Sequence, residues 1–352
     1  MKRTINDIFK LACSLALGGG ILFWMYRDFD FGSVREVLLE EMNWWWMLLS
    51  FPFGILAQAF RGWRWKQSLE PLGEHPRTSV TMNSIFLSYA ASLVIPRIGE
   101  FARCGVLKRF EGVSFPKSLG TVVTERAIDS LFVAILAGTT IALQANVFDI
   151  FFSRTGNNID RMLYQFTTTG WVVTAICAVA AIILALYLAK RLYIYNKVKK
   201  AFEDVMQGVM SLRKVSNIPL FLAYTIGIWA SYFLHYYLTF FCFESTAGLG
   251  TACAMVTFVV GSIAVVVPTP NGAGPWHFAV KTMLILYGVS ANDALFFVLI
   301  VHSVQTLLVI MLGIFAWTSL TFTKKRLPSQ DRTYQTITRS RTTGRKASHR
   351  TP

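Results

Sequence analysis

Three charged side chains follow a helix breaker directly after an apolar run in the stretch SLVIPRIGEFARCGVL. The breaker is Pro96, and Arg97, Glu100 and Arg103 come after it. Pro96 ends a helix, and Gly99 lets the turn pack closely. An arginine guanidinium is suited to bidentate binding of a phosphate or a carboxylate. Since a charge facing lipid at the bilayer centre costs about 3 kcal/mol, these side chains must face protein or a wet cavity.

A second charged group, Glu125, Arg126 and Asp129, stands early in a later apolar segment. Glu125 and Asp129 are four residues apart and Arg126 and Asp129 are three apart, so each pair can share a helix face. Two interpretations are open for the two charged groups. They are structural ion pairs that lock one helix to its neighbour, or they line an anion-recognising cavity in which Arg97 and Arg103 face a phosphate headgroup.

A second interrupted stretch, VVVPTPNGAGPWHFAVK, lies in the other half of the chain. Its helix-breaking residues are Pro268, Pro270, Gly272, Gly274 and Pro275. Non-helical backbone at membrane depth is tolerated only where it is buried in protein or lines a cavity. A helix that restarts near Pro275 would point its N-terminal amides into that cavity. We therefore expect Asn271, His277 and Lys281 to line a substrate cavity.

Apolar runs long enough to cross a ~30 Å hydrocarbon layer recur along the chain. They predict six spans, near Ile8–Tyr26, Trp44–Phe60, Leu119–Leu143, Trp171–Ala189, Ile218–Phe241 and Leu295–Leu320. Two more apolar segments, Val80–Phe110 and Leu249–Tyr287, contain the interrupted stretches. If Val80–Phe110 crossed the membrane once, the later basic loops would fall outside, against the positive-inside rule. We therefore expect both segments to enter, turn and return as re-entrant helical hairpins.

The resulting fold class is an all-α polytopic membrane protein with six full spans and two oppositely oriented re-entrant hairpins. Its halves, about residues 43–143 and 218–320, form an inverted repeat, which is typical of transporters. Residues 1–322 make the membrane domain, with a cytoplasmic amphipathic linker at residues 190–217. Residues 323–352 are expected to be a disordered basic cytoplasmic tail.

The chain has a net charge of +15 over 352 residues, and its basic residues cluster between the apolar runs and in the tail. Arg61, Arg64, Lys66 and Arg77 predict a cytoplasmic loop after the span that ends at Phe60. The tail has nine Lys or Arg against one Asp, so it is expected to contact anionic lipid, with nucleic acid as the less favoured alternative. We expect the inner cell membrane, both termini in the cytoplasm, and anionic membrane lipids as partners without nucleic acid. Protein partners and the oligomeric state are open.

Chemistry that needs a metal, a cofactor or a nucleophile is not predicted. The five cysteines form no CxxC pair or Cys/His cluster, and neither GxSxG nor HExxH occurs. Glu125 and Asp129 could act as an acid–base pair on a lipid headgroup, but nothing supplies a nucleophile. The prediction is a protein that is not an enzyme, with no catalytic residues, no metal and no cofactor.

Three motifs together resemble the family of lysylphosphatidylglycerol synthase transmembrane regions. They are IPRIGEFARCGVL, the ERAID of residues 125–129, and PTPNGAG, in that order, and the resemblance extends over roughly residues 7–320. The matching positions are Pro96, Arg97, Gly99, Glu100, Arg103, Glu125, Arg126, Asp129, Pro270, Gly272 and Gly274. The chain departs from the family pattern at Ser92, Asn271 and His277, where relatives commonly have Asn, Gly and Glu.

The resemblance implies a lipid-related function. In the multiple peptide resistance factor, a similar membrane region is associated with flipping aminoacylated phosphatidylglycerol, and a separate soluble domain transfers the aminoacyl group. This chain is expected to be a stand-alone member without that domain. The expectation is a translocator for an anionic phospholipid or a polyprenyl-linked headgroup, with a non-transporting scaffold of envelope lipid metabolism as the alternative.

Overall fold

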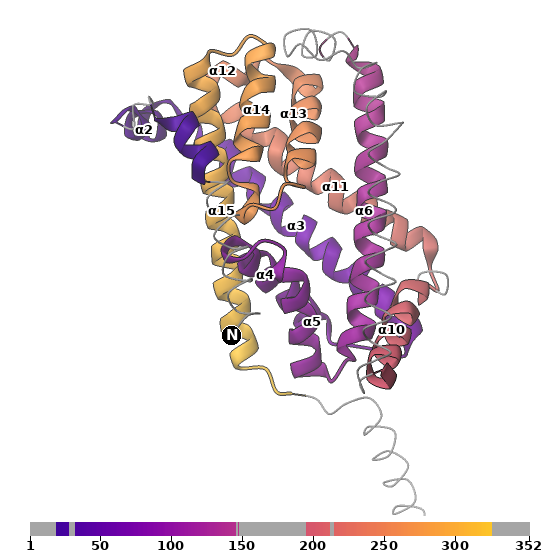
Figure 1. Ribbon diagram of the computed structural model, residues 1–352. Coiled ribbons are helices and arrows are strands. Elements are labelled where there is room, and N and C mark those ends of the chain that lie inside the picture. Colours follow the sequence, from indigo (N-terminus) through magenta and orange to yellow (C-terminus); the bar gives the residue numbers. More distant parts are fainter. Residues whose placement is uncertain (1–18, 28–31, 146, 148–194, 212–214, 326–352) are drawn as a thin grey trace, which may run out of the picture.

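The computed structural model describes residues 19–27, 32–145, 147, 195–211 and 215–325, and the elements within these residues are all helical (Figure 1). Most of the predicted span Ile8–Tyr26, the whole of Trp171–Ala189 and nearly all of the basic tail lie outside the described residues.

Three long helices carry the membrane character of the described chain. They are α6 (Phe115–Leu143), α11 (Ile218–Tyr237) with its 3₁₀ continuation η4 (Leu238–Cys242), and α15 (Ala291–Thr321). Each is long and apolar enough to cross a membrane. They correspond to three of the six predicted spans, so the prediction of an all-α membrane protein is confirmed. The count of six spans stays a prediction.

Helix α3 (Trp44–Leu69) differs from the sequence-based expectation. Asn43 caps its N-terminus, with a side chain that accepts a hydrogen bond from the Trp45 amide, and the helix does not end at Phe60. The predicted basic loop at this point is wrong, because Arg61 and Arg64 lie inside the helix with only 4% and 0% of their surface exposed. Their partners on α6, described below, explain why the helix continues.

Two helical hairpins point at each other from opposite ends of the molecule (Figure 1). In the first, α4 (Thr78–Val94) packs against α5 (Ile98–Glu111), and in the second, α13 (Gly250–Ala264) packs against α14 (Pro275–Leu286). The first turn is tight because Gly99 lies against the Ser88 carbonyl, where no Cβ would fit. The second turn is longer and contains the 3₁₀ turn η5 (Pro270–Gly272).

The hydrophobic core is divided in two. One cluster, around Phe240 and Phe297, joins the second hairpin to the first half of α15. The other, around Trp65 and Leu107, joins the first hairpin to α3 and the start of α6. The two hairpin turns and the polar groups near them therefore lie between two apolar regions.

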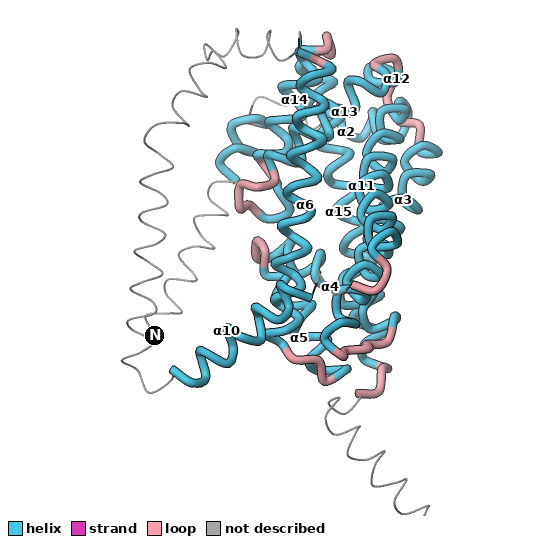
Figure 2. The backbone as a smooth tube through the Cα atoms, turned by 90° about the vertical axis from the view of Figure 1, so that its right-hand side faces the viewer, coloured by secondary structure: helices cyan, strands magenta, loops and turns pink. Residues whose placement is uncertain are grey.

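The remaining elements lie towards the two ends of the molecule. Helix α10 (Tyr195–Met210), inside the predicted amphipathic linker, packs on α6 near the end that holds α5 (Figure 2). The backbones of Gly120 and Gly208 are in direct contact there. The short elements are α2 (Gly32–Glu36), the π-helix η1 (Val37–Glu41), η2 (Glu70–Leu72) and α12 (Glu244–Ala247).

Candidate functional site

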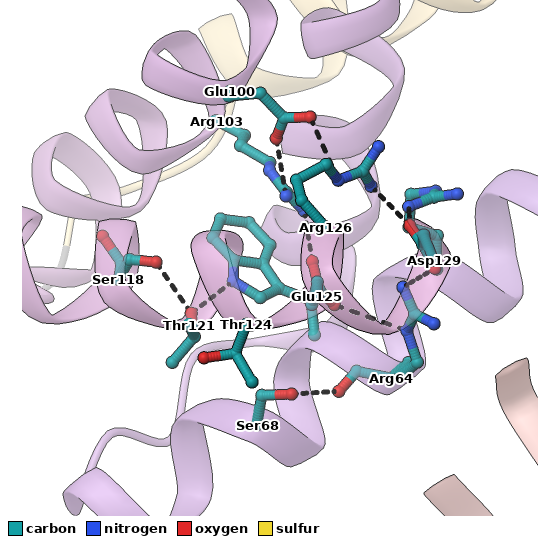
Figure 3. A network of polar contacts seen from close by, with 12 residues as sticks. Arg64, Ser68, Glu100, Arg103, Ser118, Thr121, Thr124, Glu125, Arg126 and Asp129 are labelled. Carbon is teal, nitrogen blue, oxygen red and sulfur yellow. Dashed lines mark hydrogen bonds and ion pairs between the residues drawn. The ribbon is translucent and has the colours of Figure 1, made fainter. Parts of the chain in front are cut away.

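A network of charged side chains joins α3, α5 and α6 (Figure 3). Four guanidinium groups face three carboxylates, which leaves one net positive charge. The members are Arg61, Arg64, Glu100, Arg103, Glu125, Arg126 and Asp129. The network thus contains five of the residues predicted from the sequence, and adds Arg61 and Arg64, whose basic pattern predicts a loop.

Asp129 is the carboxylate with the most partners. It accepts hydrogen bonds from Arg61 at 2.7 Å and from Arg64 at 2.8 Å, and it forms an ion pair with Arg126 at 3.0 Å. Asp129 is buried, as are Arg61 and Arg64. A buried charge is tolerated only when it is paired. The carboxylate of Asp129 therefore compensates the charges of two buried arginines on helix α3.

Glu125 and Arg103 form the second centre of the network. The two side chains are 2.9 Å apart, and both are 1% exposed. The Arg103 guanidinium also lies 2.6 Å from Glu100 and stacks on Trp65, 4.6 Å from the ring centroid. The indole Nε1 of Trp65 donates to Thr121 at 2.9 Å. With these contacts, Arg103 is directed into the protein, and its geometry fits the interpretation of a structural ion pair.

Glu100 lies at the edge of the network, with 28% of its side chain exposed. Its carboxylate pairs with Arg103 and, at 3.4 Å, with Arg126, whose side chain is 41% exposed. Glu100 also lines the cavity described below. It is therefore the contact between the buried network and that cavity.

Arg97 is held in an unusual backbone conformation at the first hairpin turn. Its φ of 61° lies in the left-handed region, and within the described residues only Asn271 shares this among non-glycine residues. Such a conformation costs roughly 1–3 kcal/mol for a residue with a bulky side chain. The exposed guanidinium donates to the Val266 carbonyl in the opposite hairpin at 2.8 Å. Among the described residues Arg97 forms no ion pair with a carboxylate within 4 Å.

A cavity of about 400 Å³ lies where the two hairpin turns meet. Its walls come from α3, α4, α11 and α15 as well as from both turns. The polar side chains that line it include Gln58, Tyr89, Arg97, Glu100, Tyr232 and Asn271. The hydroxyls of Tyr89 and Tyr232 form a hydrogen bond of 2.5 Å across one wall. This volume lies in the range of ligand pockets, about 300–1,000 Å³.

The second hairpin turn contributes Asn271 to this cavity. The side-chain amide of Asn271 donates to Thr306 at 2.8 Å, and the backbone carbonyl of Asn271 lies 3.1 Å from Nε2 of the His302 ring, which donates to it. His277 is buried behind the turn, with its ring centroid 4.4 Å from that of His302. His277 and Lys281 are not part of the cavity lining, in contrast to the expectation from sequence.

Three further polar groups of the lining were not singled out from the sequence. Gln58 Oε1, Thr269 Oγ1 and Gln305 Nε2 are buried without a hydrogen-bond partner in the described part of the chain. For Gln58 and Gln305 the available signal was an isolated polar residue within an apolar helix, which in a membrane protein marks a functional position. No group of three or more His, Cys, Asp or Glu side chains able to hold a metal ion is found among the described residues.

Comparison with known proteins identifies one family. The family model described as "Lysylphosphatidylglycerol synthase TM region" matches residues 11–313, which is most of the chain. A curated relative, glycosyltransferase AglD of Haloferax volcanii, is 27% identical over 146 residues. That match covers 39% of this chain but only 23% of AglD. No solved structure matches this chain significantly.

Proposed function

This chain belongs to the lysylphosphatidylglycerol synthase TM region family, and from that membership we propose that it is a lipid translocator. Its substrate is an anionic phospholipid or a polyprenyl-linked headgroup. The observation that carries the proposal is the meeting of two opposed hairpin turns around one cavity that Arg97, Glu100 and Asn271 help to line. Broken helices that meet near the bilayer midplane form the substrate sites of many transporters.

The proposed topology has six spans and two re-entrant hairpins in the inner membrane, with both termini in the cytoplasm. It is supported by the opposed directions of the two hairpins and by the three long apolar helices beside them (Figure 1). In this orientation the cavity lies between the leaflets, and α10 lies at the cytoplasmic surface. The non-helical turns line the cavity, as irregular backbone at membrane depth must.

Arg97 is the residue proposed to bind the phosphate of the headgroup. Three properties support this role: the guanidinium lines the cavity, it lacks a carboxylate partner among the described residues, and its backbone is strained. Strained residues persist where the surrounding structure holds them, and they concentrate at functional sites. The buried ion pairs of Arg103, Glu125 and Asp129 hold α3, α5 and α6 together and thereby fix the first turn.

The test is lipid movement in proteoliposomes that contain fluorescent phosphatidylglycerol. A membrane-impermeant reductant bleaches the outer leaflet, so that further loss of signal reports translocation. We expect rapid loss with the wild type and a rate at least about tenfold lower with Arg97→Ala, since a charged hydrogen bond contributes roughly 1.5–3 kcal/mol. Glu100→Gln should also slow translocation, because it loosens the contact between the network and the cavity.

Lys108→Ala is the matched control. Lys108 is an exposed cation on the same helix as Arg103, far from the turn and outside the cavity lining, so its removal should leave the rate unchanged. Wild-type protein that moves neither anionic phospholipids nor polyprenyl lipids would refute the proposal. An Arg97→Ala variant that is folded and as fast as the wild type would remove Arg97 from the lipid path.

The alternative is a non-transporting membrane scaffold. It is favoured by α10, which leaves Met206 and Met210 more than 40% exposed on the helix that docks beside α6. A scaffold would keep its function in cells when Arg97 is replaced and would lose it when this helix surface is changed. No enzymatic step belongs to either function.

A further inference from the structure

A second hollow of the molecule is an apolar groove of about 360 Å³, which shares no lining residue with the cavity between the hairpin turns. Its lining comes from α3, α4 and α15, and α4 packs against both of the other helices. The large side chains in it are Trp63, Met82, Phe86 and Phe315. Phe315 is 57% exposed, so the groove is open at the protein surface. It therefore offers an apolar surface to the surrounding membrane.

The lining of this groove changes from apolar to polar along the helices. Asn83 on α4 donates to Ser319 on α15 at 2.8 Å, which fixes the register of the two helices. Phe86 and Phe315 lie about one turn from this pair on one side, and Thr78 lies on the other side. The eight residues from Thr78 to Phe86 correspond to about 12 Å of helix. The groove thus has an apolar end and a hydroxyl-bearing end.

Basic residues gather at the hydroxyl-bearing end. The ammonium group of Lys66 on α3 donates to Thr78 at 3.0 Å. Arg77, the residue before Thr78, donates to the backbone carbonyl of Lys324 at 2.7 Å, which brings the exposed Lys324 to this end of the groove. Arg77 is paired with Glu111, whereas Lys66 and Lys324 form no ion pair with the described residues. Two cations are therefore available to an anionic group here.

The order of cations, hydroxyl groups and apolar side chains matches the order of parts in an anionic phospholipid. The phosphate comes first, then the glycerol esters, then the acyl chains. A soluble anion would use only the cationic end and would leave the apolar end uncovered. Basic pockets between helices at the cytoplasmic side of a membrane bind lipid headgroups, and tryptophan is enriched at this depth, where Trp63 lines the groove.

We propose that this groove binds one anionic phospholipid of the cytoplasmic leaflet, and that this lipid is resident and is not transported. Its phosphate contacts Lys66 and Lys324, and one acyl chain lies against Phe86 and Phe315. The leaflet follows from the topology proposed above, in which this end of the molecule faces the cytoplasm. The bound lipid would join the start of α4 to α3 and α15 and so support the first hairpin.

Photocrosslinking to the full-length protein in detergent micelles tests the proposal. The probes are phosphatidylglycerol and phosphatidylcholine with a diazirine in one acyl chain, and mass spectrometry of peptides locates the adducts. We expect adducts of the phosphatidylglycerol probe on the peptides that contain Trp63, Phe86 and Phe315. Unlabelled phosphatidylglycerol should compete for them better than phosphatidylcholine does. Equal labelling of these peptides by both probes would mean bulk lipid only and would overturn the proposal.

Variants test the two ends of the groove separately. Lys66→Gln should weaken the competition by phosphatidylglycerol roughly fivefold and leave that by phosphatidylcholine unchanged, since one lysine near anionic lipid contributes about this factor. Lys200→Gln is the matched control, because Lys200 is an exposed cation of α10 outside the groove lining. Ser79→Trp places a bulky ring at an exposed position of the groove and should remove the Phe315 adduct. Equal effects of the two glutamine variants, or an undiminished adduct in Ser79→Trp, would overturn the proposal.

Arg97→Ala separates this site from the proposed transport cavity. Arg97 lines that cavity and not the groove, so its replacement should leave the groove adducts unchanged. Loss of these adducts in a folded Arg97→Ala variant would make the groove part of the transport path and would overturn the proposal of a resident lipid. Groove adducts in a protein that moves no lipid in proteoliposomes would reject the translocator and support the resident site.

Discussion

Replacing Asp129 by alanine should destabilise the protein more than any other single change in the charged network. Asp129 is the partner of Arg61 and Arg64, whose side chains are 5% and 0% exposed. Removing one partner of a buried ion pair costs roughly 3–5 kcal/mol, because the other charge stays buried. Arg64 would keep Thr225 at 3.1 Å and Glu125 at 3.6 Å, whereas Arg61 would keep no ion-pair partner within the described residues. We therefore expect a loss of about 4 kcal/mol.

This loss should lower the melting temperature by about 10 °C, since 1 kcal/mol corresponds to about 2–4 °C in chains of 150–250 residues. A thiol-reactive dye can follow unfolding, because Cys104, Cys242 and Cys253 are buried and become reactive when the helices separate. Adding Arg61→Met to Asp129→Ala should recover part of the loss, because the unpaired buried charge is then absent.

Arg126→Ala is the matched control for this prediction. Arg126 also contacts Asp129, at 3.0 Å, but its side chain is 41% exposed, so solvent screens the pair. Its removal should cost no more than about 1 kcal/mol. A melting temperature of Asp129→Ala close to the wild type, or equal losses for Asp129→Ala and Arg126→Ala, would refute the view that Asp129 compensates buried arginines.

Two other substitutions test the packing around the first hairpin. Gly99→Ala should lower the melting temperature, because the added Cβ overlaps the Ser88 carbonyl and overpacking costs about 1–3 kcal/mol, whereas Gly105→Ala on the same helix meets open space and should be neutral. Tyr89→Phe and Tyr232→Phe should each cost about 1 kcal/mol of unfolding free energy by stranding the other hydroxyl, and the double variant should cost less than their sum in a double-mutant cycle.

The two hairpins could be predicted from the sequence, because the residues that break each helix lie next to one another in the chain. Proline and glycine interrupt an apolar run at Pro96 and again at residues 268–275, and the positive-inside rule then relates the two interruptions. The structure has a helical hairpin at each position, although the first turn is shorter than expected and Gly99 lies within α5. Local patterns thus predicted which helices break and roughly where.

The residues that make up the site were harder to predict from the sequence, because the side chains that pair with one another are far apart in the chain. Arg61 and Arg64 have the pattern of a cytoplasmic loop, since nothing near them in the chain indicates that Asp129 will cover their charge. Hydropathy averages over a window, so single polar residues such as Gln58 and Gln305 are lost within apolar helices. Their shared position is found only when α3 and α15 are placed around one cavity.

The left-handed backbone at Arg97 has a consequence for how this position tolerates variation. Glycine and asparagine adopt that conformation at little cost, so a selection for thermal stability alone should replace arginine by one of them. A selection for lipid movement should retain arginine despite the strain. Deep mutational scanning under the two selections would therefore give opposite residue preferences at this position. In a homologue, arginine here would indicate selection for lipid movement, and glycine or asparagine would indicate selection for stability.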